Sequence, residues 1–174
     1  GEHRNNNSTF TLYQMISENC LSADSDTGGE GTNYKASFSK VVNAQRTTPN
    51  TPYMVKVEKD LSGDDTSFEI QQKGSDIYAT PNGMQEDYTF VGETAKGTIG
   101  NSNYTFTNYG SYSGKKLDKN IGWFYFGQNK FYNSKNLSEK YNYVYMYPFR
   151  AYFGYKTDVS AKDMAGFEVS FDEP

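Results

Sequence analysis

The chain has 174 residues and a formal net charge of −4, and 17% of its residues are aromatic although only 35% are hydrophobic. A chain of this length suits one domain with a sizeable core. It lacks a basic stripe that could bind a phosphate backbone, which argues against nucleic acid as a partner, and it lacks the run of about 18 apolar residues that a membrane-spanning helix needs.

The composition is typical of a β protein with many turns. Its 16 tyrosines and 12 phenylalanines supply the burial that leucine and isoleucine usually supply. We expect a disordered segment over residues 1–8 and a single domain over residues 9–174. Because the chain begins with Gly1 rather than methionine, we interpret it as a fragment of a longer, processed protein.

Short runs of strand-forming residues predict about a dozen strands and no long helix. In chain order, we expect strands over residues 9–15, 34–41, 51–58, 67–71, 76–79, 87–92, 103–109, 122–127, 131–132, 141–147, 149–155 and 166–172. The polar residues 128–130 indicate a hairpin turn, and the long stretches 17–33 and 111–120 are predicted as loops. This regular spacing favours an all-β, antiparallel β-sandwich with jelly-roll-like connections.

The predicted loop over residues 17–33 carries acidic residues at alternate positions followed by glycines. Its sequence from Asp24 to Glu30 is DSDTGGE, a spacing found in calcium-binding loops. The twelfth position counted from Asp24 is Lys35, however, where such a loop has a bidentate glutamate. We therefore expect a solvated turn without metal or cofactor, and a calcium site is the alternative.

The residues that enzymes use for nucleophilic catalysis are scarce. The single cysteine, Cys20, excludes an internal disulfide, and a nucleophilic role would need a histidine partner. The single histidine, His3, lies in the polar N-terminal segment. A glycosidase would need two converging carboxylates, whereas the acidic residues fall mainly in turn-like segments. We therefore expect a protein without enzymatic activity, in which Cys20 acts as a small buried apolar residue.

The densest aromatic region, residues 121–155, contains a strand in which every second residue is tyrosine. Because successive side chains of a strand point to opposite faces, four tyrosines share one face: Tyr141, Tyr143, Tyr145 and Tyr147. Val144 and Met146 share the other face. The tyrosines either stabilise a sheet through cross-strand pairs, or form, together with Trp123, an exposed platform that stacks on sugar rings or on a partner protein.

Arg150 is the only charged residue between Tyr141 and Tyr155. Our first interpretation is a guanidinium that stacks between aromatic rings or closes a strand end. The alternative is an arginine that binds a ligand.

Five segments carry a further pattern. They are Thr51–Lys56 (TPYMVK), Tyr88–Gly92 (YTFVG), Trp123–Tyr132 (WFYFG followed by FY), Phe149–Phe153 (FRAYF) and Phe167–Phe171 (FEVSF). In this order and spacing they resemble the TPYIVK, FVGTY, LYLG with LYY, FRAYF and closing strands in the C-terminal β domain of secreted or surface leucine-rich-repeat and adhesin-like proteins of Bacteroidetes. A strand expected before Thr9 is missing, and the loop over residues 17–33 is longer than usual.

This resemblance implies an exported module at the bacterial cell surface that serves adhesion or a structural role in a larger protein. It implies no catalytic residues. The alternative function is a carbohydrate-binding module that uses Tyr141, Tyr143, Tyr145 and Trp123. On either hypothesis we expect a monomer whose partner is a protein or glycan at the cell surface.

Overall fold

A computed structural model of the chain describes residues 10–24, 31–42, 47, 51–58, 89–157 and 164–172. The predicted disordered segment over residues 1–8 and the predicted strands over residues 67–71 and 76–79 lie outside these ranges.

Twelve strands and one short 3₁₀ helix make up this part of the chain. The strands are β1 (Phe10–Met15), β2 (Leu21–Ala23), β3 (Tyr34–Lys40), β4 (Met54–Val57), β5 (Thr89–Ile99), β6 (Ser102–Ser111), β7 (Lys115–Asp118), β8 (Phe124–Gly127), β9 (Lys130–Asn133), β10 (Tyr143–Met146), β11 (Ala151–Thr157) and β12 (Gly166–Asp172), and the helix is η1 (Ser134–Asn136). The predicted all-β class is thus confirmed, and the sandwich arrangement stays a prediction.

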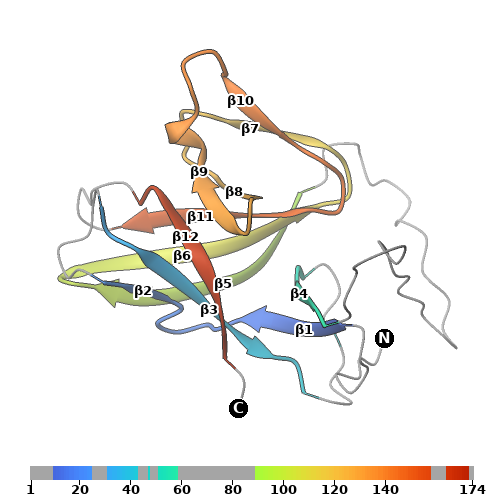
Figure 1. Cartoon of the computed structure of the whole chain (residues 1–174), viewed down its shortest axis with the longest axis vertical. Helices are drawn as coiled ribbons and strands as arrows, with labels where there is room; N and C mark the ends of the chain where they lie inside the picture. Colours follow the sequence, from blue (N-terminus) through green and yellow to red (C-terminus); the bar gives the residue numbers. More distant parts are fainter. Residues whose placement is uncertain are drawn as a thin grey trace, which may run out of the picture.

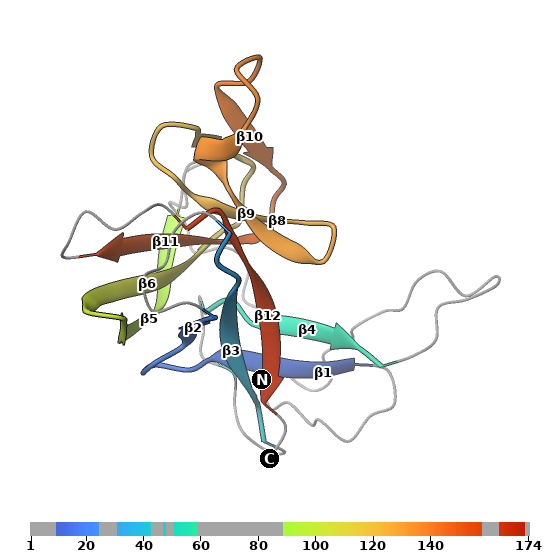
Figure 2. The same ribbon diagram turned by 60° about the vertical axis from the view of Figure 1, so that its left-hand side comes forward.

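Ten of these strands form one large curled sheet. Their order is β4-β1-β3-β12-β9-β8-β11-β6-β5, and β2 pairs with β3 outside this path. The pair β12–β3 is parallel, and the other paired strands are antiparallel. The two remaining strands, β7 and β10, form a separate antiparallel ribbon at the end of the molecule opposite to the end of β12 (Figures 1 and 2).

Hydrogen bonds join the outermost strand β5 to the connection between β1 and β2. The amide of Asn19 donates to the carbonyl of Lys96 at 2.9 Å, and the amide of Lys96 donates to the carbonyl of Ser17 at 3.0 Å. On the neighbouring strand, the Tyr104 hydroxyl accepts from the amide of Leu21 at 2.9 Å and donates to its carbonyl at 3.4 Å. The sheet therefore curls until its two halves meet, as Figure 2 shows.

We expect Tyr104→Phe to lower the free energy of unfolding by about 2 kcal/mol, because it leaves buried backbone groups of Leu21 without their partner. Chemical denaturation monitored by circular dichroism measures this change. Tyr155→Phe is the matched control, because the Tyr155 ring lies 6.0 Å from that of Tyr104 and its hydroxyl makes no hydrogen bond with any described residue. If the two variants lost the same free energy of unfolding, the result would contradict a role for the Tyr104 hydroxyl in joining the two halves of the sheet.

Phenylalanine rings fill the core between the two halves of the curled sheet, here called the first core. Its centre is Phe153 of β11, whose ring stacks on Phe106 at 4.9 Å and meets Phe131 edge-on at 4.9 Å. Phe167 of β12 stacks on Phe131 at 4.9 Å. Residues from nine strands enter this cluster, so aromatic residues do supply the main burial of the protein.

A second core joins the β7–β10 ribbon to the other face of β11. Leu117, Met146 and Tyr152 are buried there, and Trp123 packs edge-on against the Tyr152 ring at 5.2 Å. Gly154 favours this close packing, because a Cβ atom there would lie 3.0 Å from the Tyr109 ring and 3.2 Å from the Trp123 ring. The ribbon is thus fixed to the curled sheet by its inner face.

The predicted hairpin turn between β8 and β9 is confirmed. Gly127 pairs with Lys130, so the loop consists of Gln128 and Asn129, which have φ angles of 46° and 69°. Positive φ at both central residues is the geometry of a type I′ turn, which matches the twist of the flanking strands.

Candidate functional site

The β7–β10 ribbon has an apolar inner face and an aromatic outer face. Val144 is paired with Leu117 and Met146 with Lys115, and these side chains point toward the second core. Tyr143 and Tyr145 alternate with them and point outward. The predicted division of this strand into a tyrosine face and a valine–methionine face is confirmed over Tyr143–Met146, and Tyr141 and Tyr147 lie just outside the observed strand.

All four tyrosines predicted to share a face are exposed to solvent. Their exposed fractions are 59% for Tyr141, 44% for Tyr143, 50% for Tyr145 and 69% for Tyr147. The rings of Tyr145 and Tyr147 meet edge-on at 5.5 Å. We call these four residues the tyrosine face. No element of the described chain buries this face. Cross-strand packing within a sheet therefore explains only part of the surface of these tyrosines.

Lys116 on β7 and Gly114, just before β7, lie next to the rings of Tyr143 and Tyr145. The ammonium of Lys116 lies 4.8 Å from the centre of the Tyr143 ring, which is a cation–π distance. A Cβ atom at Gly114 would clash with the hydroxyl of Tyr145, so the glycine lets this ring lie directly over the backbone. Neither contribution is expected from the sequence, because residues 111–120 are predicted as a loop.

The FRAYF segment divides between the surface and the two cores. Phe149 is 78% exposed, and its φ of 62° interrupts the strand alternation before β11 begins. Its amide donates to the carbonyl of Ser111 at 3.0 Å. The predicted strand over residues 149–155 therefore begins only at Ala151, because the left-handed residue turns Phe149 outward while Phe153 enters the first core.

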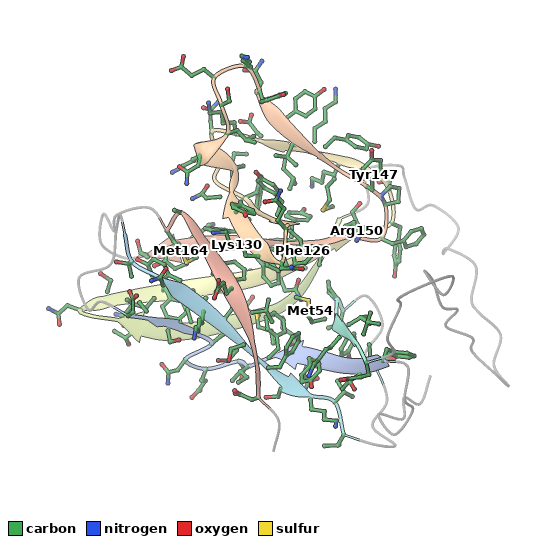
Figure 3. The ribbon with its side chains drawn as sticks, viewed as in Figure 1. Met54, Phe126, Lys130, Tyr147, Arg150 and Met164 are labelled. Carbon is green, nitrogen blue, oxygen red and sulfur yellow. The ribbon has the colours of Figure 1, made fainter. Side chains whose placement is uncertain are left out.

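Arg150 is exposed beside the end of the tyrosine face, near Tyr147 (Figure 3). Within the described ranges it has no ion pair and no contact over an aromatic ring. The predicted stacking of Arg150 between rings is therefore not present in this part of the structure. Its guanidinium is free to meet a ligand.

Trp123 does not belong to the tyrosine face. Its ring lies edge-on to Tyr109 at 5.3 Å and to Tyr152 at 5.2 Å, on the opposite side of the ribbon from Tyr143. Because the inner face of the ribbon supplies the apolar surface that this large ring needs, Trp123 fixes the ribbon and does not extend the platform.

Cys20 is fully buried, and its thiol donates to the carbonyl of Ser37 at 3.4 Å. Burial raises the pKa of this thiol to about 11, so the thiolate needed for nucleophilic attack is scarce at neutral pH. The expectation that Cys20 acts as a small buried residue is confirmed.

Asp24, the first residue of the segment that resembles a calcium-binding loop, is hydrogen-bonded to Asn33. Its two carboxylate oxygens accept from the backbone amide of Asn33 at 2.9 Å and from the Asn33 side-chain amide at 2.7 Å, and these bonds lower the pKa of Asp24. Residues 25–30 lie outside the described ranges. The part of the chain that is described contains no group of three side chains able to hold a metal.

A hollow of about 610 Å³ lies where β5 meets the β1–β2 connection. Glu18 is the only carboxylate among its lining residues, which also include Lys96 and Lys156. Two carboxylates are needed for the usual glycosidase reaction, so this hollow lacks that arrangement.

Glu93 and Asn108 are the polar side chains with unsatisfied buried atoms in the described structure. Glu93 lies in β5 where the register with β6 shifts between Val91 and Thr94. Glu93 Oε2 and Asn108 Oδ1 have no hydrogen-bond partner, and burial raises the pKa of Glu93.

We expect Glu93→Gln to raise the free energy of unfolding at pH 7 by less than about 1 kcal/mol, because it removes a charge that is costly to bury but that solvent partly screens. A raised carboxyl pKa means that the folded state binds a proton more tightly than the unfolded state. The cost of burying the Glu93 charge is therefore present when the pH is above the pKa of Glu93 in the folded protein. This cost disappears as the pH falls through that pKa. Thermal unfolding of both proteins between pH 4 and pH 8 measures the effect, with the exposed Glu168→Gln as control. A gain that does not shrink toward low pH would contradict this account.

Comparison with protein-family models, curated proteins and solved structures finds no match for this chain. Within the described ranges, no helix has the length and hydropathy needed to cross a membrane.

Proposed function

We propose that this chain is a non-enzymatic, exported surface module that binds a glycan through its tyrosine face and so serves adhesion. The observation that carries this proposal is the exposure of the four tyrosines of the tyrosine face, from 44% for Tyr143 to 69% for Tyr147. Large exposed aromatic patches mark binding surfaces because leaving them in water is unfavourable.

The chemistry of tyrosine suits a sugar ligand. A tyrosine ring offers an apolar surface on which the C–H groups of a sugar ring can pack, and its hydroxyl can bond to sugar hydroxyls. Ordering a tyrosine costs little entropy because the side chain has only two rotatable bonds. The inner face of the ribbon, packed on the second core, holds the rings in place before the ligand arrives.

The resemblance to the C-terminal domains of Bacteroidetes surface proteins supports the proposed location. The FRAYF segment of that resemblance, Phe149–Phe153, follows the tyrosine face directly. On this proposal the chain acts as a monomer within a larger exported protein. The curled sheet would then be a variant of the antiparallel, jelly-roll-like β-sandwich, with the first core between its two halves.

The alternative is an adhesion or structural module whose exposed tyrosines contact a protein. Tyrosine is enriched at the centres of protein interfaces, and Phe149, which is 78% exposed, extends the apolar surface beyond the tyrosine face.

Affinity electrophoresis in native gels containing different soluble polysaccharides tests the proposal. We expect at least one polysaccharide to slow the migration of the protein, and we expect Tyr143→Ala to reduce this effect. Phe126→Ala is the matched control, because Phe126 is 53% exposed but lies on the β8–β9 hairpin. Unchanged migration with every polysaccharide would reject glycan binding and leave the protein-binding alternative.

A further inference from the structure

We propose that the tyrosine face selects an anionic polysaccharide, whose sugar rings carry carboxylate or sulfate groups. This inference rests on the proposed function and names the class of glycan that the site takes.

The β7–β10 ribbon differs in charge from the chain as a whole. The strands and turns of the ribbon, residues 112–120 and 138–150, carry five basic side chains: Lys115, Lys116, Lys119, Lys140 and Arg150. The same residues contain two carboxylates, Asp118 and Glu139, although the chain as a whole has a net charge of −4. The ribbon is therefore a basic element on an acidic protein, and its field attracts an anionic ligand toward the exposed tyrosines.

Lys116 lies on the same side of the ribbon as the tyrosine face. Lys116 is paired with Tyr145 across the ribbon, and its ammonium lies 4.8 Å from the centre of the Tyr143 ring. Side chains directly opposite each other in an antiparallel pair share a face. Lys116 therefore lies on the outer face of the ribbon opposite Tyr145, with its ammonium over the exposed Tyr143 ring, where it can reach a ligand bound to the tyrosine face.

Lys116 and Arg150 keep their capacity to bind a ligand. The ion pair between Lys56 and Glu58 involves no residue of the ribbon. Lys116 and Arg150 are exposed, and neither forms an ion pair with a described residue. Asp118 on the same face already accepts a hydrogen bond from the amide of Asn120 at 2.7 Å.

These contacts favour charged over neutral sugars. A neutral sugar ring gains only the packing on tyrosine, and it must displace water from an ammonium that it cannot neutralise. A uronate or sulfated ring gains the same packing and also a charge-assisted hydrogen bond from Lys116. A nucleic acid is less suitable, because its closely spaced phosphates need a longer basic surface than this ribbon offers.

Two polymers that share a sugar backbone but differ in charge distinguish the contribution of charge to the affinity from that of ring packing. We would measure the affinity of the whole chain for polygalacturonate and for its highly methyl-esterified form, in which the carboxylates are neutral. The variants are Lys116→Gln and, as matched control, Lys156→Gln, an exposed lysine of β11 outside the ribbon. Dextran sulfate and dextran form a second pair, and a DNA duplex tests for indiscriminate binding of anions.

We expect the charged member of at least one pair to bind at least tenfold more tightly than its neutral counterpart. Lys116→Gln should weaken this binding about fivefold and reduce its dependence on salt, whereas Lys156→Gln should change neither. Equal affinity for charged and neutral polymers would overturn the inference but not the proposed function. Equal losses in the two lysine variants, or tighter binding to the duplex, would also overturn it. Binding to none of the polymers, neutral or charged, would reject the proposed function as well.

Discussion

Replacing Tyr143 and Tyr145 together by alanine is expected to lower the affinity for a bound polysaccharide about 30-fold. Both rings are exposed on the outer face of the β7–β10 ribbon, so neither contributes to the first or the second core. Truncation of an aromatic residue at the centre of a binding surface commonly costs more than 1 kcal/mol, and two such losses of about 1 kcal/mol give this factor. Isothermal titration calorimetry with the polysaccharide that slows migration most measures the change.

The same double variant should keep its fold. Val144 and Met146 still hold the ribbon against the second core, so we expect the midpoint of thermal unfolding to fall by no more than a few degrees. The emission of Trp123, the only tryptophan, reports separately on the inner side of the ribbon and should not shift. The exposed Phe126→Ala is again the control for a general loss of aromatic surface. An equal loss of affinity in Phe126→Ala, or none in the double variant, would show that the tyrosine face is not the binding surface.

Phe153→Ala is expected to have the largest effect on stability, a loss of about 4 kcal/mol in the free energy of unfolding. The Phe153 ring lies 4.9 Å from Phe106, 4.9 Å from Phe131 and 5.6 Å from Phe167, and it is almost completely buried. Removing such a ring loses its transfer free energy and leaves a cavity. Since a domain of this size is stable by roughly 5–15 kcal/mol, much of the total stability depends on this residue.

Urea denaturation measures this loss, provided that the variant is produced in folded form. Phe153→Leu keeps most of the volume and should lose roughly half as much, which gives a measurable protein if the alanine variant does not fold. Phe126→Ala, at the exposed end of the β8–β9 hairpin, should lose less than about 1 kcal/mol. A loss at Phe153 no larger than that at Phe126 would contradict the central place of this ring in the first core.

Local patterns in the sequence determined several features correctly. The alternation from Tyr141 to Tyr147 predicted which side chains of β10 point outward, because neighbouring residues of any strand must face opposite ways. The polar residues between Phe126 and Phe131 predicted a hairpin, because a two-residue turn depends on its own residues. The abundance of tyrosine and phenylalanine predicted an all-β protein with an aromatic core.

Strands that lack a local pattern were missed. β7 (Lys115–Asp118) contains a single buried apolar residue, Leu117, and β2 (Leu21–Ala23) has only three residues. Both lie in stretches predicted as loops, and each is a strand because a partner distant in sequence supplies its hydrogen bonds: β10 for β7, and β3 for β2.

The sequence by itself thus determined the strand class, the faces of β10 and the tight turn, since each depends on residues within a few positions of one another. Only the tertiary structure decided that Trp123 packs inward, that Phe149 turns outward and that Lys116 lies over Tyr143. It also decided that the sheet curls until Tyr104 reaches Leu21. These features depend on contacts between segments far apart in the chain, which no pattern of neighbouring residues encodes.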